Sequence, residues 1–489
     1  MVKENNLLST GIEGLDEILK DGLIPRRFYL VRGGPGTGKT TLGLHFLTEG
    51  INQRGKNLLV TMTEPAEKIK QNGKKFGFNM DKIEFIDLSP SSDFIQENKS
   101  YDIFPSSQME QKPLIDKLTQ TIEKLKPERI FFDGITQLKY LTSDKYKFRK
   151  LILSFMNYVM DYNTTILLTS EVGTINSDDD LQFMVDGIIH LEYKNQNHTI
   201  EIKKYRGSSF KKGSHTLKFK SQGITVYPLL SSTNFNEEYD RGQVSSGIPE
   251  INKLLHGGIE KGTTTTITGP SGAGKTTLGT QFIKEGAGKG IKSIIYTFEE
   301  SNKTLLKRSK AIEIPLDEMI QSNNLIIKKV NPLEYTPDEF SNEVREDVEK
   351  NKASIVMLDS ITGYFLSFNS HHKEQKMLRG LHALCEYLKK NGVTVFMINE
   401  MKNITGDFKV TDYNTSYLAD NIIFLRYLEI HGKLKKAIGV LKKRMSGFEN
   451  TMREYRITRS GIKVGEPLKN LRGILNGNPE IIEFDQEDK

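Results

Sequence analysis

Short apolar and β-branched runs alternate along this chain with segments of helical periodicity. The runs that predict strands are FYLVRG (28–33), NLLVTM (57–62), RIFFD (129–133), TTTTITG (263–269), SIIYTF (293–298) and SIVMLD (354–359). Between them, PLIDKLTQTIEKL (113–125) places its apolar residues on one helical face, and TTLGLHFLTEG (40–50) and TTLGTQFIKEG (276–286) end at glycine. Strands that alternate with helices in this way predict an α/β fold with a mainly parallel sheet covered on both faces.

The second half of the chain repeats the first. GIEGLDEIL begins at Gly11 and GIPEINKLL begins at Gly247, 236 residues later. The segments GGPGTGKTT (33–41) and GPSGAGKTT (269–277) keep the same spacing, and both fit G-x-x-x-x-G-K-[ST]. Two such motifs inside a wider repeat indicate tandem phosphate-binding domains. The predicted limits are 1–230 for the first domain, 231–243 for a polar linker, 244–470 for the second domain and 471–489 for a short tail.

The glycine-rich segments have the chemistry of a phosphate-binding loop, or P-loop. Backbone N–H groups at a helix N-terminus converge on phosphates, and glycines let the backbone approach them. We expect Lys39 and Lys275 to reach the β- and γ-phosphates, and Thr40 and Thr276 to ligate Mg²⁺. The predicted nucleotide contacts are Gly34, Gly36, Thr37, Gly38, Lys39, Thr40 and Thr41 in the first copy, and Ser271, Gly272, Ala273, Gly274, Lys275, Thr276 and Thr277 in the second.

Carboxylates stand where such a site needs them. Asp133 and Asp359 each end a predicted buried strand, so both are expected to hold Mg²⁺, directly or through water. Hydrolysis also needs a group that orients or deprotonates the attacking water or hydroxyl. The pair Glu299–Glu300 follows a strand of the second copy, whereas 236 residues earlier the chain has Thr63 and Glu64. We predict catalytic glutamates at Glu299, Glu300 and Glu64; the alternative, exposed glutamates at strand ends, stays open.

Composition narrows the class of protein. The net charge of +7 is small for 489 residues and is spread along the chain, so nucleic acid is not an expected partner. The single cysteine, Cys385, excludes an intrachain disulfide and follows an apolar helical pattern that predicts burial. No apolar run approaches the roughly 20 residues of a membrane span, and the first ten residues lack the apolar core of a signal peptide. A cytoplasmic protein is the expectation.

These motifs, in this order and twice, resemble the KaiC family, the clock-type ATPases and autokinases with two RecA-like domains. The resemblance also covers STGIEGLDEIL (9–19), IDLSP (86–90), VSSGI (244–248) and ADNIIFLRYLEIHG (419–432). It implies a homohexamer with ATP bound between subunits. It further implies slow ATP hydrolysis in the first domain and phosphate transfer to the chain itself in the second.

The resemblance also assigns residue roles. Glu299 matches the general base of the second domain. Late strands of the two domains supply Lys204 and Arg206, and Lys442 and Arg444, which match cations that reach the neighbouring subunit's nucleotide. Cations at alternate strand positions project to one side and can neutralise γ-phosphate charge. Without the resemblance, these residues are also consistent with solvated strand ends.

The family's adjacent phosphoacceptors fall in VTDYNTSYLADN (410–421). Anchored on Asp420, this segment places Ser416 at the serine position, and Thr411 and Asp412 also match. Tyr417 stands where the family has a threonine, which departs from a two-step Ser/Thr cycle. Ser416 is therefore the predicted acceptor, with an ordinary hydroxyl-rich loop as the alternative.

Other departures and alternatives concern partners. The sequence ends with IIEFDQEDK (481–489), so regulation by a KaiA-type protein is not expected. The polar segment 89–112 predicts a surface loop, or a contact for a protein partner in the first domain. Two other functions stay open: a RecA- or helicase-like DNA motor, and a nucleotide-gated scaffold. The motor would need basic or aromatic loops, but 172–182 is acidic and 402–409 only moderately basic.

Overall fold

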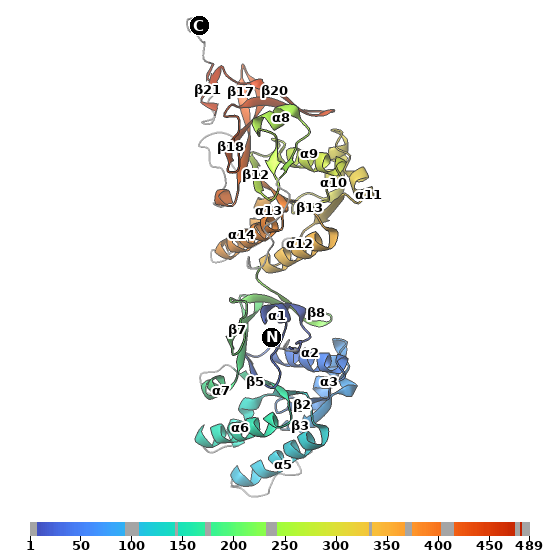
Figure 1. Cartoon of the computed structure of the whole chain (residues 1–489), viewed down its shortest axis with the longest axis vertical. Coiled ribbons are helices and arrows are strands. Elements are labelled where there is room, and N and C mark those ends of the chain that lie inside the picture. The colour runs from blue at the N-terminus through green and yellow to red at the C-terminus, as the bar shows by residue number, and fades with distance from the viewer. Residues whose placement is uncertain are drawn as a thin grey trace, which may run out of the picture. The chain divides into compact units, whose positions relative to one another are not determined.

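The computed structural model divides the chain into two compact units, Met1–Leu229 and Leu230–Lys489 (Figure 1). The residues that it describes are 7–92, 107–141, 145–171, 178–230, 242–331, 335–366, 374–401, 415–474 and 480–481. Several predicted features lie outside these ranges: Thr411, Asp412, the segment 402–409, residues 231–241 of the predicted linker, 93–106 of the predicted surface loop and 172–177 of the acidic segment.

The first unit is built on a nine-stranded sheet with the order β3-β2-β4-β5-β1-β6-β7-β8-β9. The strands from β3 to β6 are parallel, and β7 to β9 continue the sheet as an antiparallel ribbon. The strands are β1 Phe28–Gly33, β2 Asn57–Thr61, β3 Glu84–Asp87, β4 Arg129–Asp133, β5 Thr165–Glu171, β6 Gly187–Lys194, β7 Asn197–Tyr205, β8 His215–Lys220 and β9 Gly223–Tyr227. The helices are α1 Glu13–Ile18, α2 Lys39–Asn52, α3 Ala66–Lys75, α5 Ser107–Leu125, α6 Lys145–Met160 and α7 Asp179–Met184, with 3₁₀ turns at Met80–Lys82 and Ile135–Leu141.

The second unit repeats this topology as β14-β13-β15-β16-β12-β17-β18-β19-β20. Its strands are β10 Gln243–Val244, β11 Ile259–Glu260, β12 Thr264–Gly269, β13 Ser293–Thr297, β14 Leu325–Lys329, β15 Ile355–Asp359, β16 Thr394–Glu400, β17 Asn421–Ile430, β18 Lys433–Lys443, β19 Arg453–Thr458, β20 Gly461–Pro467, β21 Leu471–Arg472 and β22 Glu480–Ile481. Its helices are α8 Pro249–Leu254, α9 Lys275–Gly288, α10 Asn302–Lys310, α11 Leu316–Gln321, α12 Pro337–Asn351, α13 Ile361–Leu366 and α14 Glu374–Lys390, with a 3₁₀ turn at Thr415–Tyr417. The pairs β10–β11 and β21–β22 form separate two-stranded sheets.

The parallel part of each sheet is buried on both faces, to which successive side chains of a strand point in turn. In β1, Tyr29 and Val31 pack with α1, α2 and the ribbon, whereas Phe28 and Leu30 pack with α5 and α6. Apolar residues at every position are therefore buried, as in other parallel sheets. The predicted fold of two α/β units with mainly parallel sheets is confirmed.

Two further expectations can be compared with the structure. Cys385 on α14 is 1% exposed, so its predicted burial is confirmed. Within the ranges that the structure describes, no helix combines the length and the apolarity that crossing a membrane requires.

Candidate nucleotide sites

The two P-loops follow the carboxyl ends of β1 and β12 and begin the long helices α2 and α9. Gly38 and Gly274, the residues before these helices, have φ angles of 100° and 103°. A Cβ atom at Gly38 would lie 2.8 Å from Phe219 Cζ, and one at Gly274 would lie 2.5 Å from Ile457 Cδ1. Both the backbone conformation and the packing of the ribbon therefore require glycine.

The P-loop lysines are bonded to their own loops. Lys39 Nζ donates to the carbonyls of Gly33 and Gly34, each at 2.8 Å, and Lys275 Nζ donates to Pro270 O at 2.8 Å. Burial lowers the pKa of both ammonium groups, and nearby carboxylates oppose this shift.

A hydroxyl and a carboxylate meet beside each lysine. Thr40 Oγ1 donates to Asp133 Oδ2, and Thr276 Oγ1 donates to Asp359 Oδ2, both at 2.8 Å. Burial raises the pKa of Asp133, and it raises the pKa of Asp359 to about 6. A cation bound at either strand end would therefore stabilise the charged form of a buried carboxylate. Paired carboxylate and hydroxyl oxygens are ligands that suit Mg²⁺, so these residues fit the expected ion.

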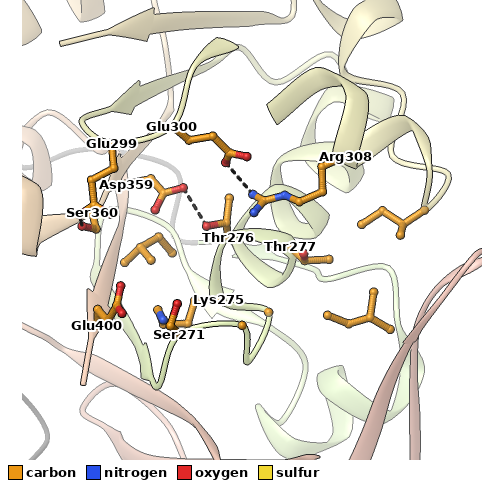
Figure 2. A pocket seen from close by; sticks show the side chains of 15 residues that line it. Ser271, Lys275, Thr276, Thr277, Glu299, Glu300, Arg308, Asp359, Ser360 and Glu400 are labelled. Atoms are coloured by element: carbon orange, nitrogen blue, oxygen red, sulfur yellow. Dashed lines mark hydrogen bonds and ion pairs between the residues drawn. The ribbon is translucent and has the colours of Figure 1, made fainter. Parts of the chain in front are cut away.

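In the second unit the P-loop opens into a cavity of about 410 Å³ (Figure 2). The side chains and backbone that line it are Ser271, Gly272, Gly274, Lys275, Thr276, Thr277, Glu299, Glu300, Arg308, Ile312, Asp359, Ser360, Ile398, Glu400 and Ile457. The structure therefore brings the predicted loop residues except the buried Ala273 together with Glu299, Glu300 and Asp359 in one cavity.

The two glutamates have different partners, although they are adjacent in sequence. Ser360 Oγ donates to Glu299 Oε1 at 2.6 Å, and Ser360 directly follows the strand-end Asp359. Glu300 instead forms an ion pair with Arg308, at 2.9 Å between Oε2 and Nη2. Figure 2 shows Glu299 beside Ser360 and Glu300 turned toward Arg308. Glu299 therefore stays close to the Thr276–Asp359 pair without a cationic partner among the described residues.

The first unit lacks both of these arrangements. Glu64 Oε1 pairs with Lys68, one turn along α3, at 3.1 Å, and the Glu64 side chain is 43% exposed. Gly134 follows Asp133 with a φ of 89°, and a Cβ atom there would lie 2.5 Å from Thr63 Cγ2. Where the second unit has the hydrogen-bonded pair Glu299 and Ser360, the first unit thus has Thr63 packed against Gly134.

The predicted cations lie at the other edge of each sheet. Asp186 and Asp420 accept hydrogen bonds from Phe28 N and Thr264 N, the first residues of β1 and β12. The backbone N–H groups of Arg206 and Arg444 donate to the carbonyls of these same aspartates. The P-loops leave β1 and β12 at their opposite ends. Neither arginine is therefore brought to the P-loop of its own unit.

The two lysines and Ser416 share that edge. Lys204 Nζ donates to Gln182 O at 2.8 Å, and Lys442 Nζ donates to Ala419 O at 2.6 Å and Ser416 O at 3.3 Å. Ser416 is half-buried, and Gln182 takes its place in the first unit. Only the second unit therefore offers a serine hydroxyl at this position.

Sequence reasoning did not identify the residues of β7, β17 and β18 that touch the P-loops. Lys436 Nζ donates to Gly272 O at 2.8 Å, and Tyr427 OH donates to Ser271 O at 3.3 Å. In the first unit a ring nitrogen of His198 lies 3.3 Å from Gly36 O. These residues are far from the loops in sequence, and only the pairing of the ribbon strands places them there. Arg308, a cation on the amphipathic helix α10, was also missed, because only the folded structure brings it to the P-loop.

Comparisons with known proteins agree with this geometry. The family model described as "ATPase: KaiC" matches residues 8–231 and again 244–469. The circadian clock oscillator protein KaiC of Parasynechococcus marenigrum (strain WH8102) is 28% identical, with 98% of this chain and 94% of the relative aligned. The protein of the same name from Prochlorococcus marinus (strain MIT 9313) is also 28% identical, with 98% and 96% aligned. The chain belongs to the KaiC family of ATPases and carries its ATPase domain twice.

Proposed function

We propose that this protein is a homohexameric, Mg-ATP-dependent ATPase whose second domain is also a serine autokinase acting on Ser416. The observation that carries the proposal is the second-unit cavity, where Glu299 stands beside the P-loop lysine and the Thr276–Asp359 pair. The first unit has the loop and the aspartate but not that glutamate.

The site residues of the second unit have separate roles in this proposal. The P-loop N–H groups and Lys275 bind the phosphates, while Thr276 and Asp359 hold Mg²⁺, which neutralises phosphate charge when bound. Glu299 accepts the proton of the attacking water or serine hydroxyl. The attacking oxygen forms a bond to the γ-phosphorus while the bond between the γ-phosphorus and the bridging oxygen breaks. ADP leaves with the bridging oxygen. Ser360 orients the Glu299 carboxylate.

The sheet topology supports action between subunits. Ser416, Lys442 and Arg444 lie at the edge away from their own P-loop, so within one unit they do not meet the γ-phosphate. In a ring of like subunits, this edge can face the P-loop of a neighbour. There the cations would stabilise transferring charge and Ser416 would receive the phosphoryl group.

The first domain is proposed to bind Mg-ATP and to hydrolyse it more slowly. Its loop and its Thr40–Asp133 pair match those of the second unit. Glu64 is the remaining carboxylate, and its pairing with Lys68 directs it toward the exposed side of α3. Turnover by Lys275→Ala protein, in which the second loop is disabled, would report this activity.

The test is phosphopeptide mass spectrometry after incubation of the purified chain with Mg-ATP. We expect phosphate on the peptide containing Ser416, none in Ser416→Ala, and none in Glu299→Gln. Glu318→Gln, a charge-matched change on α11 outside the cavity, is the control and should be phosphorylated normally. Protein that hydrolyses ATP but never carries phosphate near Ser416 would overturn the autokinase assignment and leave the ATPase.

A further inference from the structure

Arg308 is a second cation inside the nucleotide cavity of the second unit. It reaches from α10 to Glu300, and its side chain is 45% exposed, whereas that of Glu300 is 23% exposed. Arg308 lines the same cavity as Thr276 and Thr277, and Figure 2 shows its guanidinium turned toward Glu300. Arg308 is therefore close to where the P-loop receives phosphates, but its observed partner is a carboxylate.

The charges that line this cavity explain why such a partner matters. Lys275 and Arg308 are its cations, against the four carboxylates of Glu299, Glu300, Asp359 and Glu400. A nucleoside triphosphate adds several negative charges to an already acidic site. A carboxylate that is not compensated there repels the ligand, and a cation at ion-pair distance removes most of this repulsion.

The first unit shows what happens when the extra glutamate is missing. Helices α3 and α10 begin 236 residues apart, and this spacing places Asn72 opposite Arg308 and Thr63 opposite Glu299. The second unit thus has a glutamate at 299 and an arginine at 308, whereas the first unit has an uncharged residue at each matching position. Glu64 pairs outward with Lys68 instead.

We propose that Arg308 is a positioning residue of the second nucleotide site, which holds and neutralises Glu300 so that an acidic pair can stand beside a bound triphosphate. This inference rests on the proposed function, since it assumes that ATP binds in this cavity. Arg308 acts through Glu300 rather than as a ligand of the phosphates. Its effect on nucleotide affinity therefore depends on whether position 300 carries a charge.

The experiment measures Mg-ATP affinity by calorimetry, with a non-hydrolysable analogue, in full-length protein carrying Lys39→Ala to disable the first loop. Arg308→Met should weaken binding about fivefold at low salt, and by less at high salt. The double variant Glu300→Gln/Arg308→Met should return to within about twofold of the parent, because both charges of the pair are then gone. Arg308→Lys keeps the charge and should bind nearly as the parent does.

Lys307→Met is the matched control, because it removes the same charge from the adjacent, exposed position of α10, outside the cavity. A double variant as weak as Arg308→Met would overturn the proposal, since it would mean that Arg308 contacts the nucleotide itself. Arg308→Met binding like Lys307→Met would also overturn it. A parent that binds no ATP would instead contradict the proposed function, and this inference with it.

Discussion

At the scale of single residues, a hydrogen bond distinguishes Glu299 from its neighbour Glu300. The Ser360 hydroxyl donates to Glu299 and also accepts a hydrogen bond from Gly363 N at 3.1 Å, which fixes the direction of the donated proton. A carboxylate held in this way keeps one oxygen in place while the other can take a proton. Under the proposed function, Ser360 therefore orients the general base Glu299.

Replacing Ser360 with alanine should lower the kcat of the second domain about tenfold and change KM little, because substrate contacts remain while the base loses its orientation. Steady-state ATPase assays in a Lys39→Ala background measure both constants. Ser322→Ala, an exposed position at the end of α11, is the control and should keep the parent rate. A pure KM effect would show that Ser360 serves binding instead.

His45 on α2 connects the first domain's stability to pH. Its Nε2 accepts a hydrogen bond from Ile224 N at 2.8 Å, and burial lowers the pKa of the imidazole from 6.5 to about 4. Between these pH values the unfolded chain binds a proton that the folded chain does not. The free energy of unfolding should therefore fall as the pH drops from 6.5 toward 4, by at most about 3 kcal/mol.

Thermal unfolding followed by calorimetry between pH 7.5 and 5 measures this loss for the transition of the first domain. His45→Gln, which copies the residue that lies 236 positions later, Gln281, should flatten the pH dependence because glutamine does not titrate. His190 remains in both proteins, so the difference reports His45 alone. Equal slopes for the two proteins would contradict the assignment.

At the scale of elements, the loop that follows β4 differs from the one that follows β15. Gly134 combines a φ of 89° with a position where a Cβ atom would touch Thr63, whereas Ser360 stands in the second unit. The first domain therefore cannot regain the Glu299–Ser360 arrangement by changing Thr63 alone.

Gly134→Ser should lower the stability of the first domain by about 2 kcal/mol, from the strained backbone and from contact with Thr63. Thr63→Ala/Gly134→Ser should recover only part of that loss, because it removes the contact but not the φ penalty. Chemical denaturation of the three proteins tests this. Full recovery in the double variant would show that the backbone tolerates a side chain at this position.

The sequence predicts the parallel half of each sheet well and the ribbon poorly, for a physical reason. Strands such as β4 are buried on both faces, so their apolar runs are visible without knowledge of their neighbours. Ribbon strands such as β8 keep polar residues beside apolar ones, and their place depends on pairing across the sheet. The motif-bearing loops were therefore identified from sequence, whereas His198, Lys436 and Arg308 required the three-dimensional arrangement.

At the scale of the whole molecule, the proposed phosphate donor and acceptor of the second unit lie at opposite edges of its sheet. The P-loop of the second unit follows the end of β12, while Ser416 precedes β17 near the start of β12. Under the proposed assembly, phosphate leaves the loop of one subunit and arrives at the serine of the next.

Mixing two inactive variants tests this arrangement. Lys275→Ala protein should lack the donor and Ser416→Ala protein the acceptor, so neither alone becomes phosphorylated at Ser416. After disassembly and co-assembly, the Lys275→Ala chains should gain phosphate from their Ser416→Ala neighbours, as mass spectrometry of the two distinguishable chains would show. No phosphate in the mixture would contradict transfer between subunits.

The opposed edges also bear on how much protein a cell must hold. If each active site is formed at an interface between two chains, the amount of phosphate transfer follows the number of interfaces rather than the number of chains. Dilution below the concentration at which the subunits assemble would stop phosphate transfer without unfolding any domain. A modest excess of subunits that are defective at one sheet edge would then inactivate many interfaces, because each such subunit also disables the site that it shares with an intact neighbour. Gene dosage, rather than catalytic rate alone, would set the response of this protein.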